Sequence, residues 1–273
     1  MKKIKLCFDA GHYTNYNISN VYKNYCEGNM VWKLHILVKE YLEKNYSNVE
    51  IVMTRNNRDK DLSLSNRGAK AKGCDGFYSF HSNACDDKNV NRVVIIRGVG
   101  ETKLNNYAKK LGDTIKKCMN INQETQVYEK SKNNGDEYYG VLRAAKLVGV
   151  KNRYILEHSF HTNYNSAKWL CNEANLKKLA IEEAKVIAEH HGIVKKGNDS
   201  NTTWENGTYN IKVKATANLN LRSGRGTNFP IVTTIKKGTV FKLGYVYKNW
   251  GSTWDFNGTD LYFSCEYVSK LNN

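Results

Sequence analysis

The chain has 273 residues, 40% of them hydrophobic, and carries a formal net charge of +16 at pH 7. This length exceeds one typical domain and falls short of three, so we expect two domains, with enough apolar residues for a core. No apolar run approaches the roughly 18 residues that span a bilayer, so we expect no membrane insertion. The charge suits a polyanionic partner, which can be nucleic acid, an anionic membrane or an acidic cell wall.

The first part of the chain alternates strand-like and helix-like segments. Apolar runs predict strands at residues 4–8, 49–53, 76–80, 93–96 and 153–156. Helical spacing of apolar residues predicts helices at 30–46, 101–119 and 175–190. Strands alternating with helices indicate an α/β fold over residues 1–194, with a twisted, mostly parallel sheet flanked by helices.

The pattern changes after residue 194. Residues 195–206 are polar and poor in apolar side chains, which is typical of a linker. Beyond them, short strands separated by glycine-containing turns are predicted at 210–213, 219–221, 231–235, 240–246 and 262–268. We therefore expect a small all-β barrel over residues 207–273.

Seven cysteines are scattered singly, with no Cys-x-x-Cys pair. This spacing argues against a thiolate zinc site or a redox motif and favours free thiols in a reducing compartment. The first residues show no apolar stretch of signal-peptide length. We therefore expect synthesis in the cytoplasm without a signal peptide.

Four residues distant in sequence carry the chemistry that we predict. His12 follows the first strand, Glu27 precedes the first helix, and His81 and Glu157 each end a predicted strand. Ligands bind where the carboxyl ends of parallel strands meet, so these side chains can share one cleft. Two imidazoles and one carboxylate bind zinc and leave a fourth position for water, while a second carboxylate can move protons. Each residue alone has an ordinary structural explanation, and only their joint placement suggests a site.

With these residues in place, the chain resembles the zinc-dependent N-acetylmuramoyl-L-alanine amidases of the third amidase family over about residues 3–192. The matching segments are Asp9-Ala10-Gly11-His12, Thr54-Arg55, Leu64-Ser65-Asn66-Arg67, Ser79-Phe80-His81-Ser82-Asn83-Ala84, Gly140-Val141-Leu142-Arg143 and Leu156-Glu157-His158-Ser159-Phe160-His161-Thr162-Asn163.

The resemblance implies particular roles. His12, Glu27 and His81 would be the zinc ligands and Glu157 the catalytic carboxylate. The segment around Glu27 resembles nothing particular, so Glu40 and Glu43, both well inside the predicted helix, are alternatives.

Three further residues are candidate substrate contacts. Arg143, expected on a strand, can bind a substrate carboxylate or pair with an internal acid. Strand alternation turns His158 and Phe160 away from Glu157, which favours His161 as the contact. The third is Asn83, beside His81. The sequence departs from the family at Ser159, where glycine is common, and at His161, where a small residue is usual.

The last 65 or so residues resemble bacterial Src-homology-3-like domains, which commonly recognise peptidoglycan peptides. The matching residues are Leu219-Asn220-Leu221-Arg222-Ser223-Gly224, Ile231 and Gly238-Thr239-Val240. Several aromatic residues are available either to line a groove or to fill the small core: Phe229, Tyr245, Tyr247, Trp250 and Trp254.

The resemblance implies a zinc-dependent hydrolase that cleaves the amide between N-acetylmuramic acid and L-alanine in peptidoglycan. Alternatives are a non-catalytic wall-binding protein and a zinc peptidase that cuts within the stem peptide. A nucleic-acid-binding protein fits the charge, but no recognised motif supports it. We expect peptidoglycan as the partner, reached after release from the cytoplasm, as for a phage endolysin; an exported autolysin is the alternative.

Overall fold

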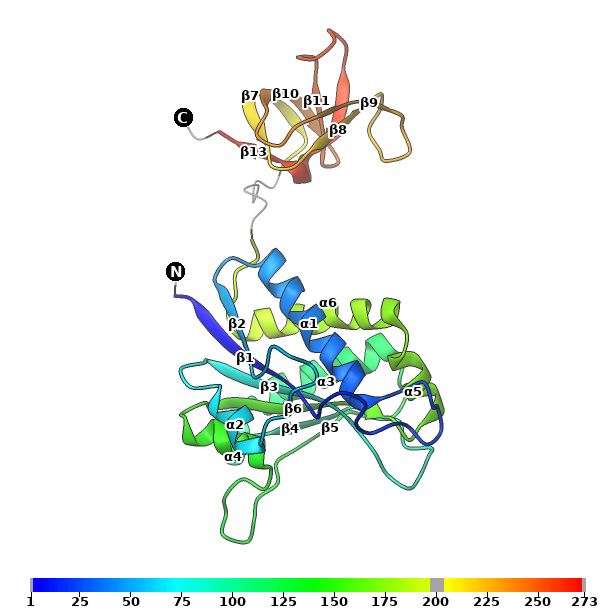
Figure 1. Ribbon diagram of the computed structural model, residues 1–273. Coiled ribbons are helices and arrows are strands. Elements are labelled where there is room, and N and C mark those ends of the chain that lie inside the picture. The colour runs from blue at the N-terminus through cyan, green and yellow to red at the C-terminus, as the bar shows by residue number, and fades with distance from the viewer. Residues whose placement is uncertain (1, 197–203, 272–273) are drawn as a thin grey trace. The chain divides into compact units, whose positions relative to one another are not determined.

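The computed structural model describes residues 2–196 and 204–271 (Figure 1). The chain divides into two compact units, Met1–Lys195 and Lys196–Asn273. Of the predicted linker, residues 197–203 lie outside the described residues. Trp204, which we also placed in the linker, packs into the core of the second unit.

Within the described part of the first unit, a six-stranded sheet has the order β2-β1-β3-β6-β4-β5. The strands are β1 (Ile4–Ala10), β2 (Val49–Met53), β3 (Gly76–Asn83), β4 (Val94–Arg97), β5 (Gln126–Tyr128) and β6 (Asn152–Phe160). β2, β1, β3 and β6 pair in parallel, whereas β4 runs antiparallel to β6. The predicted mostly parallel sheet is therefore confirmed.

Helices cover both faces of this sheet (Figure 1). One face carries α1 (Glu27–Asn45), α3 (Asn105–Met119) and α6 (Glu173–His190). The other carries α2 (Leu64–Ala69) and α4 (Gly140–Leu147), while α5 (Tyr164–Leu170) follows β6. Successive strand residues pack into opposite cores, because side chains alternate across a strand: Leu6 and Phe8 face α1, and Cys7 faces α4.

Several parts of the first unit differ from the sequence-based prediction, which did not include α2, α5 or β5. The segment around Arg143, which we expected as a strand, is helix α4. The strands that carry His81 and Glu157 do not end at those residues but continue to Asn83 and Phe160. The strand pairing therefore extends past both candidate site residues.

Within its described residues, the second unit is a seven-stranded sheet of order β13-β7-β10-β11-β12-β8-β9 whose neighbours pair antiparallel. Its strands are β7 (Gly207–Ala215), β8 (Leu219–Arg222), β9 (Ile231–Ile235), β10 (Val240–Tyr247), β11 (Trp250–Thr253), β12 (Leu261–Ser264) and β13 (Val268–Lys270). The single strand predicted at 262–268 is split by a 3₁₀ turn at Cys265–Tyr267. The core includes Val213, Leu243 and Phe263, whereas Trp254 is 44% exposed.

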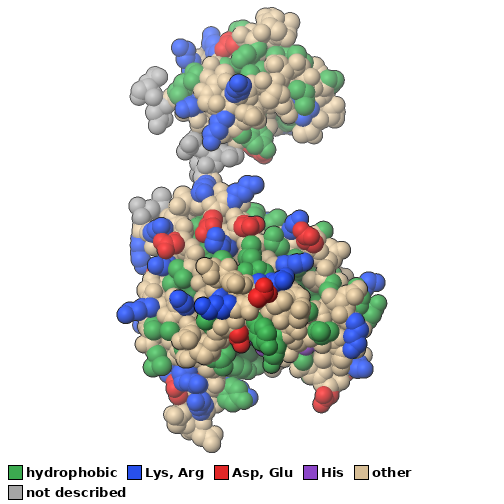
Figure 2. All heavy atoms as spheres, in the orientation of Figure 1, with side chains coloured by type: hydrophobic (Ala, Val, Ile, Leu, Met, Phe, Trp, Pro, Cys, Tyr) green, Lys and Arg blue, Asp and Glu red, His purple; other side chains and the backbone are tan. Residues whose placement is uncertain are grey.

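Lys and Arg side chains are scattered over the visible face of each unit, with Asp and Glu among them, rather than gathered into one patch (Figure 2). Of the helices in the described ranges, none combines the length and apolar character needed to cross a membrane.

Candidate active site

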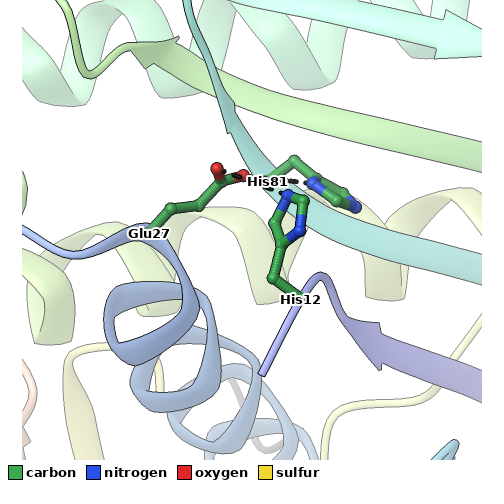
Figure 3. A group of neighbouring side chains, drawn as sticks. All are labelled: His12, Glu27 and His81. Carbon is green, nitrogen blue, oxygen red and sulfur yellow. Dashed lines mark hydrogen bonds and ion pairs between the residues drawn. The ribbon is translucent and has the colours of Figure 1, made fainter. Parts of the chain in front are cut away.

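Three side chains converge where β1 ends and α1 begins (Figure 3). His12 follows β1, Glu27 is the first residue of α1, and His81 lies in β3. One ligand atom from each lies within 4.8 Å of the others. Glu27 joins the two histidines, since its Oε1 is 3.1 Å from His81 Nδ1 and its Oε2 is 3.4 Å from His12 Nε2.

The chemistry of this trio fits a divalent cation. Glu27 is 1% exposed, and an ionised carboxylate so deeply buried requires a positive partner. Burial opposes its ionisation, but hydrogen bonds from His12 and His81 outweigh burial and hold the pKa of Glu27 well below its usual range. A carboxylate with two imidazoles is a donor set that zinc takes in hydrolytic sites.

Glu157 lies beside this trio on the neighbouring strand. It pairs in register with His81 across β3 and β6, so both side chains project from the same face of the sheet. Its Oε2 is buried without a hydrogen-bond partner among the described residues. Burial raises the pKa of Glu157 to about 7; Glu27 adds to this rise, and His81 opposes it. A carboxyl group with such a pKa can accept and donate a proton near neutral pH.

Two buried arginines hold the backbone that carries His12. Arg67 Nη1 lies 3.1 Å from Asp9 Oδ1, and Arg67 Nη2 donates to the His12 carbonyl over 2.8 Å. Arg55 Nη2 donates to the Ala10 carbonyl over 3.2 Å and also to that of His12. Burial opposes ionisation of Asp9, but Arg67 and hydrogen bonds from Thr54 and Ser79 hold its pKa below its usual value. The Thr54-Arg55 and Leu64–Arg67 segments therefore have a structural role, since their side chains hold the end of β1 and the backbone of His12 in place.

A hollow of about 300 Å³ opens beside the trio. Its wall includes His12, His81, Tyr16 and, from the α2 and α4 side, Leu64 and Val141. The candidate ligands are therefore accessible to a substrate from this side.

A comparison with protein families identifies the family of this chain. The N-acetylmuramoyl-L-alanine amidase family matches residues 6–189. The chain belongs to this family. It is therefore a peptidoglycan hydrolase that cleaves the amide between N-acetylmuramic acid and L-alanine.

Solved structures share the fold of the amidase's first unit. The catalytic domain of CwlV, an N-acetylmuramoyl-L-alanine amidase from Bacillus (Paenibacillus) polymyxa var. colistinus, is 20% identical with a TM-score of 0.58, over 71% of this chain and 99% of that one. An N-acetylmuramoyl-L-alanine amidase from Clostridium difficile 630 is 17% identical with a TM-score of 0.59, over 70% of this chain and 97% of that one. The CwlD amidase from Clostridioides difficile is 17% identical with a TM-score of 0.57, over 69% of this chain and 98% of that one. The curated proteins gave no match.

Sequence reasoning missed two residues of the amidase site. Asn17 Nδ2 donates to Glu27 Oε2 over 2.7 Å and lies 3.3 Å from His12 Nε2. The Tyr16 ring stacks on the His12 ring, with centroids 4.6 Å apart and planes 14° apart. Both lie between residues 13 and 26, where no periodicity or motif marks them. Only their position between His12 and Glu27 could have suggested a role.

His161 and Asn83 meet at the edge of the site. His161 is buried, and its Nδ1 lies 2.9 Å from Ser82 Oγ and 3.9 Å from Glu27 Oε2. The His161 amide donates to the Asn83 carbonyl over 2.8 Å. His161 therefore lies behind Glu27, supported through Ser82, with Asn83 beside it.

Arg143 lies on α4, and its guanidinium already has partners. Nη1 donates to the carbonyl oxygens of Glu137 over 2.8 Å and of Tyr138 over 3.4 Å. These are backbone acceptors, so neither a substrate carboxylate nor an internal acid is needed to explain this orientation.

A bulge corrects the alternation that we predicted for β6. Ser159 has φ +67°, and the register with β3 shifts between Glu157 and Phe160. His158 does face away from Glu157, toward α6, where it contacts Glu183. Phe160, however, packs in the same core as Ile155, on the Glu157 face, because the extra residue reverses the alternation.

The alternative ligands Glu40 and Glu43 lie far along α1. Glu40 is 13 residues beyond Glu27, which corresponds to about 20 Å along a helix. Glu43 pairs with Lys39 over 2.6 Å. Of the three acids considered, only Glu27 joins the two histidines.

Proposed function

We propose that His12, Glu27 and His81 hold a zinc ion and that Glu157 moves the proton in the amidase reaction. The observation that carries this proposal is the meeting of the three donors within 4.8 Å, beside a second acid, Glu157, on the adjacent strand. When bound, the ion would supply a water of lowered pKa and positive charge for the developing oxyanion. His12 and His81, two of the residues that would hold the ion, line the hollow beside Tyr16.

The protein residues have separate tasks in this proposal. Glu157 takes the proton of the attacking water and then gives it to the departing alanine amine, for which a pKa near 7 is suited. Asn17 orients the Glu27 carboxylate by its hydrogen bond to Oε2. We also propose substrate contacts at Asn83, which ends β3, at His161, which follows β6, and at Arg143 on α4.

Digestion of purified cell wall tests the reaction and its metal. We expect new N-terminal alanine and no new reducing sugar, loss of release after treatment with a chelator, and recovery when zinc is added. Release that survives complete removal of metal would overturn the zinc proposal. A different new N-terminus would indicate a peptidase, and no release would indicate a wall-binding protein.

We propose that the second unit is a Src-homology-3-like module that binds the wall. Support comes from its small antiparallel sheet and from exposed aromatic side chains, Tyr245 at 39% and Trp254 at 44%. Tethering would raise the local substrate concentration without new chemistry. In the full chain, Trp254→Ala should reduce co-sedimentation with wall and leave turnover of a soluble muropeptide unchanged. Equal sedimentation of the two proteins would contradict this assignment.

We further propose that the amidase is made in the cytoplasm and reaches the wall after release, in the manner of an endolysin. All seven cysteines are free thiols, which agrees with folding in a reducing compartment. Fractionation of producing cells tests this, since the amidase should stay in the cytoplasm until the membrane is opened. Its appearance outside intact cells would favour an exported autolysin instead.

A further inference from the structure

We propose that a second cavity on the amidase unit is a subsite for an uncharged N-acetylated sugar of the glycan strand; this inference rests on the proposed function. The cavity has a volume of about 670 Å³. Three segments form it: the loop from β3 to β4, the loop from α3 to β5, and helix α5.

The lining of this cavity is rich in amides and has no charged side chain. It contains six asparagines, one glutamine and Trp169, together with Ser166, Met119 and Ile121. Amide side chains both donate and accept hydrogen bonds, as do the hydroxyl and acetamido groups of such a sugar. A tryptophan face offers apolar surface against which a sugar ring can pack. A stem-peptide carboxylate would instead call for Arg or Lys, so the lining favours the glycan over the peptide.

Several of these amides are already fixed in position. Gln123 Oε1 accepts from the Asn91 amide and its Nε2 donates to the Asn89 carbonyl, both over 2.9 Å. Asn163 Oδ1 accepts from the Ser166 amide over 3.1 Å, while its Nδ2 donates to the Lys88 carbonyl over 2.8 Å. Polar groups held in place before binding lose little freedom when a ligand arrives.

Asn91 offers the cavity a hydrogen-bond donor, its side-chain Nδ2. Its Oδ1 accepts from the hydroxyls of the buried Ser159 and Ser166, each over 2.7 Å. Among the described residues nothing accepts a hydrogen bond from its Nδ2, which leaves that group for a ligand. Ser159 stands at a positive φ that glycine adopts more easily, and its hydroxyl holds Asn91 in a way that glycine could not.

The cavity adjoins the candidate zinc site along the chain. Asn163, in its wall, is two residues after His161, whose Nδ1 is 3.9 Å from Glu27. Two residues span at most about 7 Å between their Cα atoms. The segment that supports Glu27 therefore continues directly into the wall of the cavity, so the cavity and the candidate zinc site draw on adjacent residues of one segment.

The test uses the full chain and an oligosaccharide of N-acetylglucosamine, which has neither a stem peptide nor a scissile amide. Titration is followed by the indole N–H resonance of Trp169, identified by its loss in Trp169→Phe. We expect saturable binding that Asn122→Ala with Asn165→Ala weakens about tenfold, since two hydrogen-bonding side chains are removed. Both residues are exposed, so the fold should be kept.

The matched control is Asn106→Ala, an exposed asparagine in the first turn of α3, while the cavity lies at the other end of that helix. It should bind as the unaltered chain does. On glycan-linked substrate, the double variant should raise KM and keep kcat.

No shift at Trp169, equal binding by the double variant, or tighter binding of free stem peptide in this cavity would overturn the proposal. Saturable sugar binding by a protein that cleaves no wall would support the subsite and contradict the catalytic proposal alone.

Discussion

Glu183 and His158 form an ion pair inside the amidase unit, with Oε1 and Nε2 2.7 Å apart and both side chains fully buried. The other ring nitrogen, Nδ1, lies 2.9 Å from the carbonyl oxygen of His81. Because both nitrogens face acceptors, the imidazole carries two protons. Burial opposes this charge, but Glu183 outweighs burial and raises the pKa of His158. Helix α6 is thereby connected to the backbone of a candidate metal ligand.

Replacing one member of this pair should cost far more than replacing both. Glu183→Leu leaves a buried cation without its partner, and we expect a loss of about 3–5 kcal/mol in the free energy of unfolding. His158→Phe combined with Glu183→Leu removes both charges and should cost less, with Phe stacking on Phe80 as His158 does now. Urea denaturation of the unaltered chain, of the two single variants His158→Phe and Glu183→Leu, and of the double variant measures this. Additive losses would mean that the two side chains are energetically independent.

Asn17→Gly should weaken zinc binding by about 10- to 100-fold, the usual effect of removing a hydrogen bond to a ligand. Glycine is the suitable replacement because Asn17 has φ +55°, which glycine adopts without strain. Competition with a zinc-binding dye measures the affinity. Asn15→Gly is the control: its φ is +61°, but its side chain bonds to Asn29 and not to Glu27. Equal affinity for zinc in the two variants would remove the role given to Asn17.

Glu157→Gln should keep the fold and bound zinc but lower kcat by about 10²- to 10⁴-fold, because an amide cannot accept the proton of water. Zinc content, melting temperature and turnover of a muropeptide should be measured on the same preparation. Glu157 is not among the three donors that meet within 4.8 Å, so its loss should leave the metal in place. Undiminished turnover would refute the proton-transfer role.

His35 should make the fold less stable as the pH falls. It is 1% exposed, and burial lowers its pKa from 6.5 to about 4, against hydrogen bonds to backbone carbonyls that raise it. Between these two pKa values the unfolded chain binds more protons than the folded one, so stability is present above pH 6.5 and is lost toward pH 4. We expect a loss of about 2 kcal/mol between pH 7 and pH 5 from this residue.

His35→Leu supplies the comparison, since it removes the titrating group and keeps an apolar side chain. Its stability should change less with pH than that of the unaltered chain over the same range. Parallel curves of unfolding free energy against pH for the two proteins would show that His35 does not titrate as proposed.

The sequence predicted the sheet of the first unit well, because long amphipathic helices and apolar strands leave a clear periodicity. The mostly parallel sheet and the amidase function are confirmed, whereas the zinc ion and the part played by Glu157 stay predictions. Helix α4 was misassigned as a strand because Val141 and Leu142 form an apolar run too short to distinguish the repeat of a helix from that of a strand. The bulge at Ser159 escaped notice, since a non-glycine residue at positive φ leaves no sign in the pattern. Asn17 was missed because its role depends on the conformation of the loop between β1 and α1, which no periodic sequence pattern reveals.

The residues that follow the C-terminal end of α1 pair with the last residues of the catalytic unit. Tyr46, which follows the last residue of this helix, forms a β-bridge with Lys195, and the Ser47 amide donates a hydrogen bond to the Val194 carbonyl over 2.9 Å. The helix has 19 residues and so holds this pairing about 28 Å from Glu27, at its other end. Whatever follows Lys195 in the chain is therefore joined to the catalytic unit at a point remote from the candidate metal ligands.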